Sequence, residues 1–163
     1  MIVVSDSSPL IALADVGQLR LLRELFSTVL IPEAVYQEIV LAGAGRTSAE
    51  AIQTTAWIEQ RGVTNKRLAD VLKLELDAGE AEAIALALES GATLMLLDER
   101  RGRQRAVRLG LRVTGVLGVL VEAKHQRLLP AVRPVLDALR HQAGFWIGDD
   151  LYRRVLDLAG EAT

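Results

Sequence analysis

Short apolar runs alternate along the chain with longer stretches in which apolar residues recur every three or four positions. The short runs are rich in valine, isoleucine and leucine and have the length of buried strands, which we assign to residues 2–4, 29–31, 57–58, 93–97 and 113–114. The longer stretches predict helices near residues 9–14, 18–26, 33–41, 48–55, 68–76, 80–89, 106–109, 115–124, 130–142 and 149–158.

This alternation of strand and helix predicts an α/β fold in three layers. Its centre is a parallel sheet of four to five short strands, with helices on both faces. We expect residues 1–163 to form one domain, because the chain contains no repeat, low-complexity tract or linker.

Composition narrows the chemistry and the location. The chain has no cysteine, which excludes disulfides and thiolate metal sites, and its having only two histidines argues against a histidine-rich zinc site. It has neither the basic and apolar start of a secretory signal nor the roughly 20 apolar residues of a membrane span. We therefore expect a soluble, cytoplasmic protein. A net charge of −2 neither favours nor excludes nucleic acid as a partner.

Four acidic residues stand where a parallel sheet places functional sites. Asp6 directly follows the first strand, and Asp98 follows the strand at 93–97. Glu80 lies in the first turn of its helix and Glu38 in the second turn of its own. Because strands end and their following helices begin at the carboxyl edge of such a sheet, we expect all four carboxylates to converge there.

The helical phases of the two glutamates support this expectation. The neighbours of Glu38 at three and four positions are all apolar: Ala34, Val35, Leu41 and Ala42. We therefore expect Glu38 to face the core. Glu80 shares a side with Ile84, whereas Glu82 and Glu89 project from the opposite side, which we assign to solvent.

Four gathered carboxylates repel one another, and a buried carboxylate is costly unless it is paired or bound to a metal. A divalent cation removes both difficulties, and all-oxygen ligands suit Mg²⁺ or Mn²⁺. We assign a catalytic role to all four acids and metal binding to Asp6, Glu80 and Asp98. Each acid also has a structural explanation: Asp6 as an N-cap, Glu80 as an acid favoured by the helix dipole, Glu38 as a partly exposed residue, and Asp98 as a loop residue.

Six arginines crowd into thirteen residues: Arg100, Arg101, Arg103, Arg105, Arg108 and Arg112. On a helix, Arg101, Arg105, Arg108 and Arg112 form one stripe, which is either a phosphate-binding track or a solvated face, and we assign nucleic-acid binding to the first three. Arg103 shares its side with Ala106 and is expected to turn inward and pair with an acid. The aromatic residues are expected in the core or an interface rather than stacked on bases: Trp57, Phe145, Trp146 and Tyr152.

Four segments, in this order and spacing, resemble the PIN domains, in particular the bacterial and archaeal branch that is similar to VapC toxins. They are VVSDSSPLIAL at 3–13, IPEAVYQEIV at 31–40, LDAGEAEAIALALESGATLMLLDERRGRQRA at 76–106, and GLRVTGVLGVLVEAK at 110–124. The resemblance therefore covers a core at residues 1–124 and leaves the C-terminal helices at 125–163 outside it.

The resemblance implies a Mg²⁺- or Mn²⁺-dependent endoribonuclease that hydrolyses RNA phosphodiester bonds. The acids of the family fall on Asp6, Glu38, Glu80 and Asp98, with Glu80 where many PIN proteins carry aspartate. Ser7 matches a small hydroxyl residue near the metal. The resemblance further implies the toxin of a type II toxin–antitoxin system, a cognate antitoxin as partner, and a homodimer, for which the apolar C-terminal helices are suited.

Two alternatives remain open from the sequence. One is a phosphohydrolase of another doubly wound class that uses Asp6 as its nucleophile, although Ser8 stands where that class usually has a second aspartate. The other is a non-catalytic PIN-like domain that binds RNA or protein, against which the complete set of acids argues.

Overall fold

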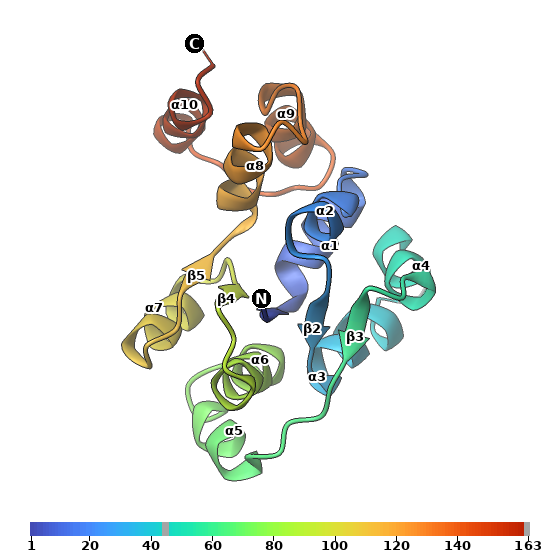
Figure 1. The fold of residues 1–163 in the computed structure, drawn as a ribbon, viewed down its shortest axis with the longest axis vertical. Coiled ribbons are helices and arrows are strands. Elements are labelled where there is room, and N and C mark those ends of the chain that lie inside the picture. Colours follow the sequence, from blue (N-terminus) through green and yellow to red (C-terminus); the bar gives the residue numbers. More distant parts are fainter. Residues whose placement is uncertain (44–45, 162–163) are drawn as a thin grey trace.

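Five parallel strands form a single sheet in the order β3-β2-β1-β4-β5 (Figure 1). The computed structural model describes residues 1–43 and 46–161. The strands are β1 (Val3–Ser5), β2 (Val29–Ile31), β3 (Ile58–Gln60), β4 (Leu94–Leu96) and β5 (Val113–Thr114). The predicted parallel sheet with helices on both faces is confirmed.

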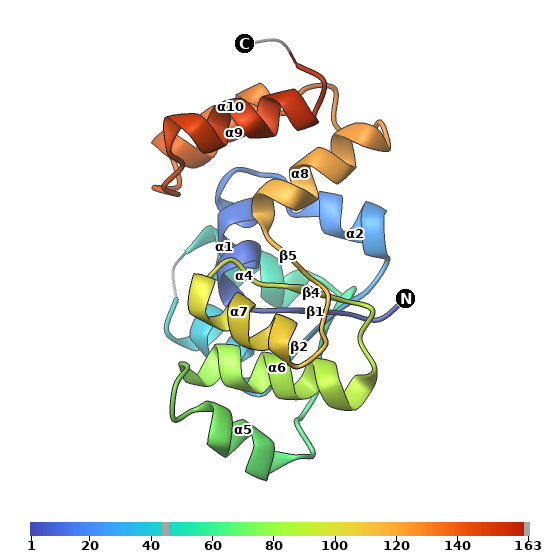
Figure 2. The ribbon, with the colours of Figure 1, turned by 90° about the vertical axis from the view of Figure 1, so that its left-hand side faces the viewer.

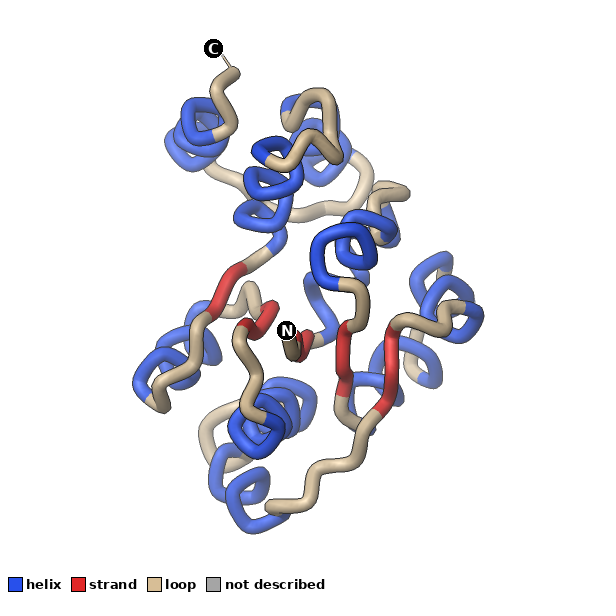
Figure 3. Tube along the Cα trace, in the orientation of Figure 1, coloured by secondary structure: helices blue, strands red, loops and turns tan. Residues whose placement is uncertain are grey.

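Helices form the outer layers and surround the short strands (Figure 3). They are α1 (Ser7–Asp15), α2 (Arg20–Phe26), α3 (Glu33–Tyr36), the π-helix η1 (Gln37–Leu41), α4 (Thr47–Thr54), α5 (Lys66–Leu72), α6 (Ala78–Ser90), α7 (Arg100–Arg108), α8 (Val116–His125), α9 (Arg133–His141) and α10 (Asp149–Leu158). Most of these ranges lie within a few residues of the predicted ones. Two differ more: α7 begins at Arg100, six residues before the predicted helix at 106–109, and α3 followed by η1 stands where one α-helix was expected.

One face of the sheet is covered by α1, α2 and α8, and the other by α3 and α6 (Figure 2). Helix α5 packs on the outside of α6, while α9 and α10 lie beyond α8 as an additional layer. Among residues 1–43 and 46–161, no helix has both the length and the apolar character needed to span a bilayer.

The central strand β1 sets the position of the site. Val3 and Val4 are fully buried because β1 pairs with β2 on one side and with β4 on the other, and helices cover both faces. The Asp6 N–H donates to the Leu96 carbonyl at 2.9 Å, so the hydrogen bonding between β1 and β4 continues past the end of β1. This hydrogen bond places Asp6 at the carboxyl edge, beside the segment that leads to Asp98.

Candidate active site

Asp6 is buried at the start of α1, where it occupies the N-cap position but makes no side-chain capping hydrogen bond. Its Oδ1 atom is buried and has no hydrogen-bond partner. The pKa of Asp6 is raised to about 7, mainly by burial and also by the charges of Asp77, Glu38 and Asp98, while the Ser7 N–H acts to lower it. Capping therefore does not explain this carboxylate.

Glu80 lies in the first turn of α6 and is only 5% exposed. Its Oε2 atom is buried without a hydrogen-bond partner and lies against Gly102 of α7. The pKa of Glu80 is raised to about 8, mainly by burial, with the hydrogen bond and the charge of Asp77 acting in the same direction. Glu80 therefore lies on the buried side of α6 together with Ile84, as the helical phase predicted.

Asp98 follows β4 and reaches the start of α8, where its Oδ1 accepts the Val116 N–H at 3.1 Å. Its Oδ2 atom is buried without a hydrogen-bond partner. Burial raises the pKa of Asp98, while the Val116 N–H and the positive charge of Arg103 lower it. Arg103 turns inward, as its apolar neighbours indicate, and its Nη1 donates to the Leu97 carbonyl at 3.0 Å. The expected pairing with an acid was wrong, because among the described residues Arg103 forms no ion pair and acts on Asp98 only through its charge.

Glu38 reaches the same edge but does not face the core, so that expectation was wrong: its side chain is exposed. The reason is the π-helical turn η1, in which the Ala42 N–H bonds to the Gln37 carbonyl at 3.0 Å, five residues back. A π turn changes the angle between successive side chains, so the α-helical phase used for Glu38 does not apply.

The carboxylates of Glu38 and Asp6 nevertheless meet above Gly79. Glu38 Oε2 and Asp6 Oδ1 lie 2.7 and 3.3 Å from the position that a Cβ atom on Gly79 would take. Asp77 Oδ1 lies 3.6 Å from the same point. Glu38 therefore completes the acid cluster from its solvent side.

Sequence reasoning missed Asp77. This residue is the N-cap of α6, and its Oδ1 accepts the Glu80 N–H at 2.8 Å. An aspartate three residues before a glutamate at a helix start is a recognisable capping pattern, and it stands at the same edge of the sheet. Glu99, which follows Asp98, was missed as well, and its charge contributes to the raised pKa of Glu80.

Three glycines let the backbone approach the carboxylates. A Cβ atom would collide with Glu38 at Gly79, with Glu80 at Gly102 and with Asp98 at Gly115. From the sequence alone, Gly79 and Gly115 could be assigned only to the starts of the helices predicted at 80–89 and 115–124. In the structure, each of the three glycines leaves the space that one acid occupies.

The donors fit a divalent cation that prefers oxygen ligands. Asp6 Oδ1, Glu80 Oε2 and Asp98 Oδ2 are all buried without hydrogen-bond partners, an arrangement that is unfavourable unless another group satisfies them. Within the described residues, no three acidic or histidine side chains are already arranged as a complete metal site. Mg²⁺ suits such a site, because it binds oxygen donors and usually keeps several waters, through which a carboxylate can also act on it.

The predicted arginine stripe is partly engaged with the protein itself. Arg101 Nη1 donates to the Glu75 carbonyl at 3.3 Å, and Arg105 Nε lies 3.9 Å from Glu75 Oε2. Arg108 is exposed. Ser7 is buried directly after Asp6 in the first turn of α1.

Two surface hollows border the acid cluster. One, of about 490 Å³, is lined by Glu38, Asp77 and Gly79. The other, of about 550 Å³, is lined by Asp98, Arg103 and the loop between α9 and α10. Each hollow thus has acids of the cluster in its lining: Glu38 and Asp77 in the first, and Asp98 in the second.

Comparisons with known proteins agree with this architecture. A family model described as PIN domain matches residues 2–161, a range that includes the C-terminal helices. The fold is similar to that of a PilT N-terminus domain protein from the hyperthermophilic archaeon Sulfolobus solfataricus P2. The two chains are 19% identical with a TM-score of 0.53, over 76% of this chain and 93% of that one. No curated protein matches the chain in sequence.

Proposed function

Because the chain belongs to the PIN domain family, whose members are generally nucleases that use divalent metal ions, we propose that it is a Mg²⁺- or Mn²⁺-dependent endoribonuclease. The observation that carries the proposal is the set of three buried, unpartnered carboxylate oxygens on Asp6, Glu80 and Asp98. These oxygens come from three separate elements and share the carboxyl edge of one sheet, where α/β proteins place their sites.

Phosphodiester hydrolysis requires an activated water and stabilisation of the charge on the phosphoryl oxygens, which a bound divalent cation supplies. Asp6, Glu80 and Asp98 would hold the cation, and Glu38 with Asp77 adds negative charge on the solvent side. The Val116 N–H holds Asp98 in place, and together with the positive charge of Arg103 it favours the ionised form of Asp98. Ser7, in the first turn of α1, donates its backbone N–H to Asp6 and so favours the ionised form of that carboxylate.

The proposal further includes RNA as the substrate and a role as the toxin of a toxin–antitoxin pair. They rest on the resemblance of four segments to VapC-like proteins. A homodimer through the C-terminal helices is supported by exposed Leu158, which borders an apolar hollow of about 380 Å³ between α8 and α10.

A cleavage assay tests the proposal. Labelled single-stranded RNA is incubated with the protein and Mg²⁺ or Mn²⁺, with and without EDTA, beside DNA of the same sequence. We expect metal-dependent cleavage of RNA, and its loss in Asp6→Asn and in Asp98→Asn with the fold intact. The matched control is Asp15→Asn, since Asp15 is an exposed aspartate at the far end of α1. Full activity in Asp6→Asn would overturn the site assignment.

A further inference from the structure

Trp146 is 85% exposed, in the loop between α9 and α10. Trp146 was expected in the core or in an interface, but within this chain it lies in neither. Part of its six-membered ring lies against Gly148, with Cη2 3.3 Å from where a Cβ atom on Gly148 would stand. Most of the indole surface remains available to a ligand.

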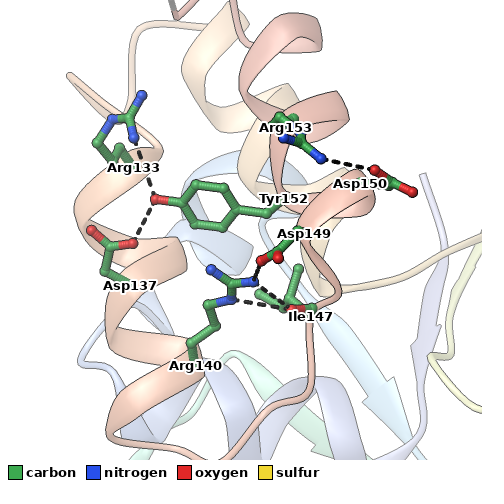
Figure 4. Close-up of polar contacts among 8 residues, drawn as sticks. All are labelled: Arg133, Asp137, Arg140, Ile147, Asp149, Asp150, Tyr152 and Arg153. Carbon is green, nitrogen blue, oxygen red and sulfur yellow. Dashed lines mark hydrogen bonds and ion pairs between the residues drawn. The ribbon is translucent and has the colours of Figure 1, made fainter. Parts of the chain in front are cut away.

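The loop that carries Trp146 is fixed by Arg140 (Figure 4). The Arg140 guanidinium donates from Nε and Nη2 to the Ile147 carbonyl, at 3.1 and 2.8 Å, and Nη2 pairs with Asp149 at 2.8 Å. The same guanidinium lies 4.5 Å from the centre of the Tyr152 ring. These contacts hold the residues directly after Trp146, so the indole is presented at a defined place and little ordering is needed on binding.

The indole borders the hollow of about 550 Å³ that opens beside Asp98. Phe145 and Leu151 add apolar surface to its lining, and polar side chains complete it: Asp98, Arg100, Arg103 and Gln104. The Arg100 guanidinium makes no hydrogen bond or ion pair with other residues in the described part of the chain. The volume lies within the range of sites for small organic ligands.

We propose that Trp146 is the stacking platform for one base of single-stranded RNA, next to the phosphate held at the acid cluster. This inference rests on the proposed function and names a substrate contact of the same site. An aromatic surface binds bases of any sequence, because every base has a π-face. Arg100 provides a cation for the adjoining phosphate, and Gln104 provides an amide for the edge of the base.

The hollow favours RNA over a protein as its occupant. Its lining contains the exposed indole of Trp146, the Arg100 guanidinium and Asp98, whose buried Oδ2 has no hydrogen-bond partner. A nucleotide matches these three features with its base, its phosphate and, through a bound cation, the phosphate to be cut. A protein segment has groups for the indole and for the Arg100 guanidinium, but it has no phosphate for a cation held beside Asp98.

The test pairs a protein variant with a change in the RNA. Binding of labelled RNA is measured in the Asp6→Asn background, in which the RNA is expected to stay intact. Trp146→Ala is compared with oligoribonucleotides that carry one abasic residue at successive positions. We expect Trp146→Ala to lower the affinity by roughly 5- to 150-fold, the range for loss of one stacked base. One abasic position should cost a similar factor with Trp146 present and little in Trp146→Ala, because the two changes remove the same contact.

Controls separate stacking from a structural role. Trp146→Phe should restore most of the affinity, and Val71→Ala, at a 55% exposed apolar residue on α5, should leave it unchanged. Melting temperatures of the Trp146 variants should equal that of the parent protein. In a Trp57→Phe variant, Trp146 is the remaining tryptophan, and RNA should quench its fluorescence.

The outcomes distinguish this inference from the proposed function. RNA cleavage with no effect of Trp146→Ala on affinity overturns the inference and leaves the nuclease in place. Coupling between Trp146 and one abasic position, with no cleavage by the wild type, supports the inference and overturns the nuclease. Loss of a protein partner or of the dimer in Trp146→Ala, with RNA affinity unchanged, identifies a protein interface and overturns the inference. Absence of both binding and cleavage overturns both.

Discussion

The Glu80 carboxylate and Gly102 are packed so closely that any side chain at residue 102 would collide with Glu80 Oε2. This contact joins α6 to α7 beside the acid cluster. Gly102 is the third residue of α7, and within a helix glycine is less favourable than alanine by up to roughly 1 kcal/mol. Packing explains why glycine stands at residue 102: its lack of a side chain leaves the space that the Glu80 carboxylate occupies.

We predict that Gly102→Ala strongly lowers metal-dependent cleavage, because the new methyl group must displace the Glu80 carboxylate. The helix itself should not suffer, since alanine is the better helix former. Cleavage rates and the melting temperature of the variant check both statements. Wild-type activity in Gly102→Ala would show that the position of Glu80 is not important.

A second change tests the physical reason. Glu80→Asp shortens the side chain by one methylene and makes room for the methyl group of Ala at residue 102. We expect Glu80→Asp to raise activity in the Gly102→Ala background while it lowers activity in the wild-type background. Additive losses in the double variant would contradict the steric explanation.

The raised pKa values predict how the stability of the metal-free protein depends on pH. Asp6 and Glu80 have pKa values of about 7 and about 8 in the folded state, above their usual values of 3.8 and 4.5. The folded state therefore binds these protons more tightly than the unfolded state. The resulting stabilisation is complete below about pH 4 and is lost as the pH rises through 7 to 8.

We accordingly predict that in EDTA the melting temperature falls between pH 5 and pH 8, and that Asp6→Asn reduces this fall and melts higher than the wild type at pH 8. Mn²⁺ should raise the wild-type melting temperature at pH 8, because ionised carboxylates bind it. The same scans on Asp15→Asn, at an exposed position, should follow the wild type. A wild-type melting temperature that rises toward pH 8 in EDTA would contradict the prediction.

The edge position of Asp6 and Asp98 followed from the sequence because it needs only strand ends and the geometry of parallel sheets. The exposure of Glu38 did not, because the π turn at residues 37–41 is not visible in a pattern of apolar residues. Glu82 was expected in solvent, yet it is half-buried, since α3 and α5 cover the outer side of α6. Periodicity within one helix says which residues share a side, but not what packs against that side.

We predict that changing Arg101, Arg105 and Arg108 together to alanine weakens RNA binding and flattens its salt dependence. The log–log slope should fall by roughly 0.7–0.9 for each phosphate contact that is lost. Because Arg101 and Arg105 also contact Glu75, the loss should be smaller than three full contacts.

Binding isotherms at several salt concentrations measure the slope. The matched control is the double change of Arg20 and Arg23 to alanine on α2, which covers the opposite face of the sheet from α6. An unchanged slope in the triple variant would show that the stripe is a solvated face.

The last prediction separates two glutamates that stand two residues apart on α6. Glu80 is buried with an unpartnered Oε2. Both Glu82 oxygens have partners, since Oε1 accepts the Ala34 N–H at 3.1 Å and Oε2 pairs with Lys73 at 3.2 Å. The first arrangement is costly for the apo protein and suits a metal ligand, whereas the second holds α3 and α5 against α6.

Opposite effects on stability and activity follow. In EDTA at pH 9, above its raised pKa, Glu80→Gln should raise the melting temperature, because it removes a buried charge. It should also abolish most Mn²⁺ binding, measured by calorimetry, and most cleavage. Glu82→Gln should keep both activities and lose about 0.5–1 kcal/mol of stability, because amide cannot pair with Lys73 and the pair is only partly exposed. If Glu82→Gln loses metal binding while Glu80→Gln retains it, the metal ligands must be reassigned around Glu82.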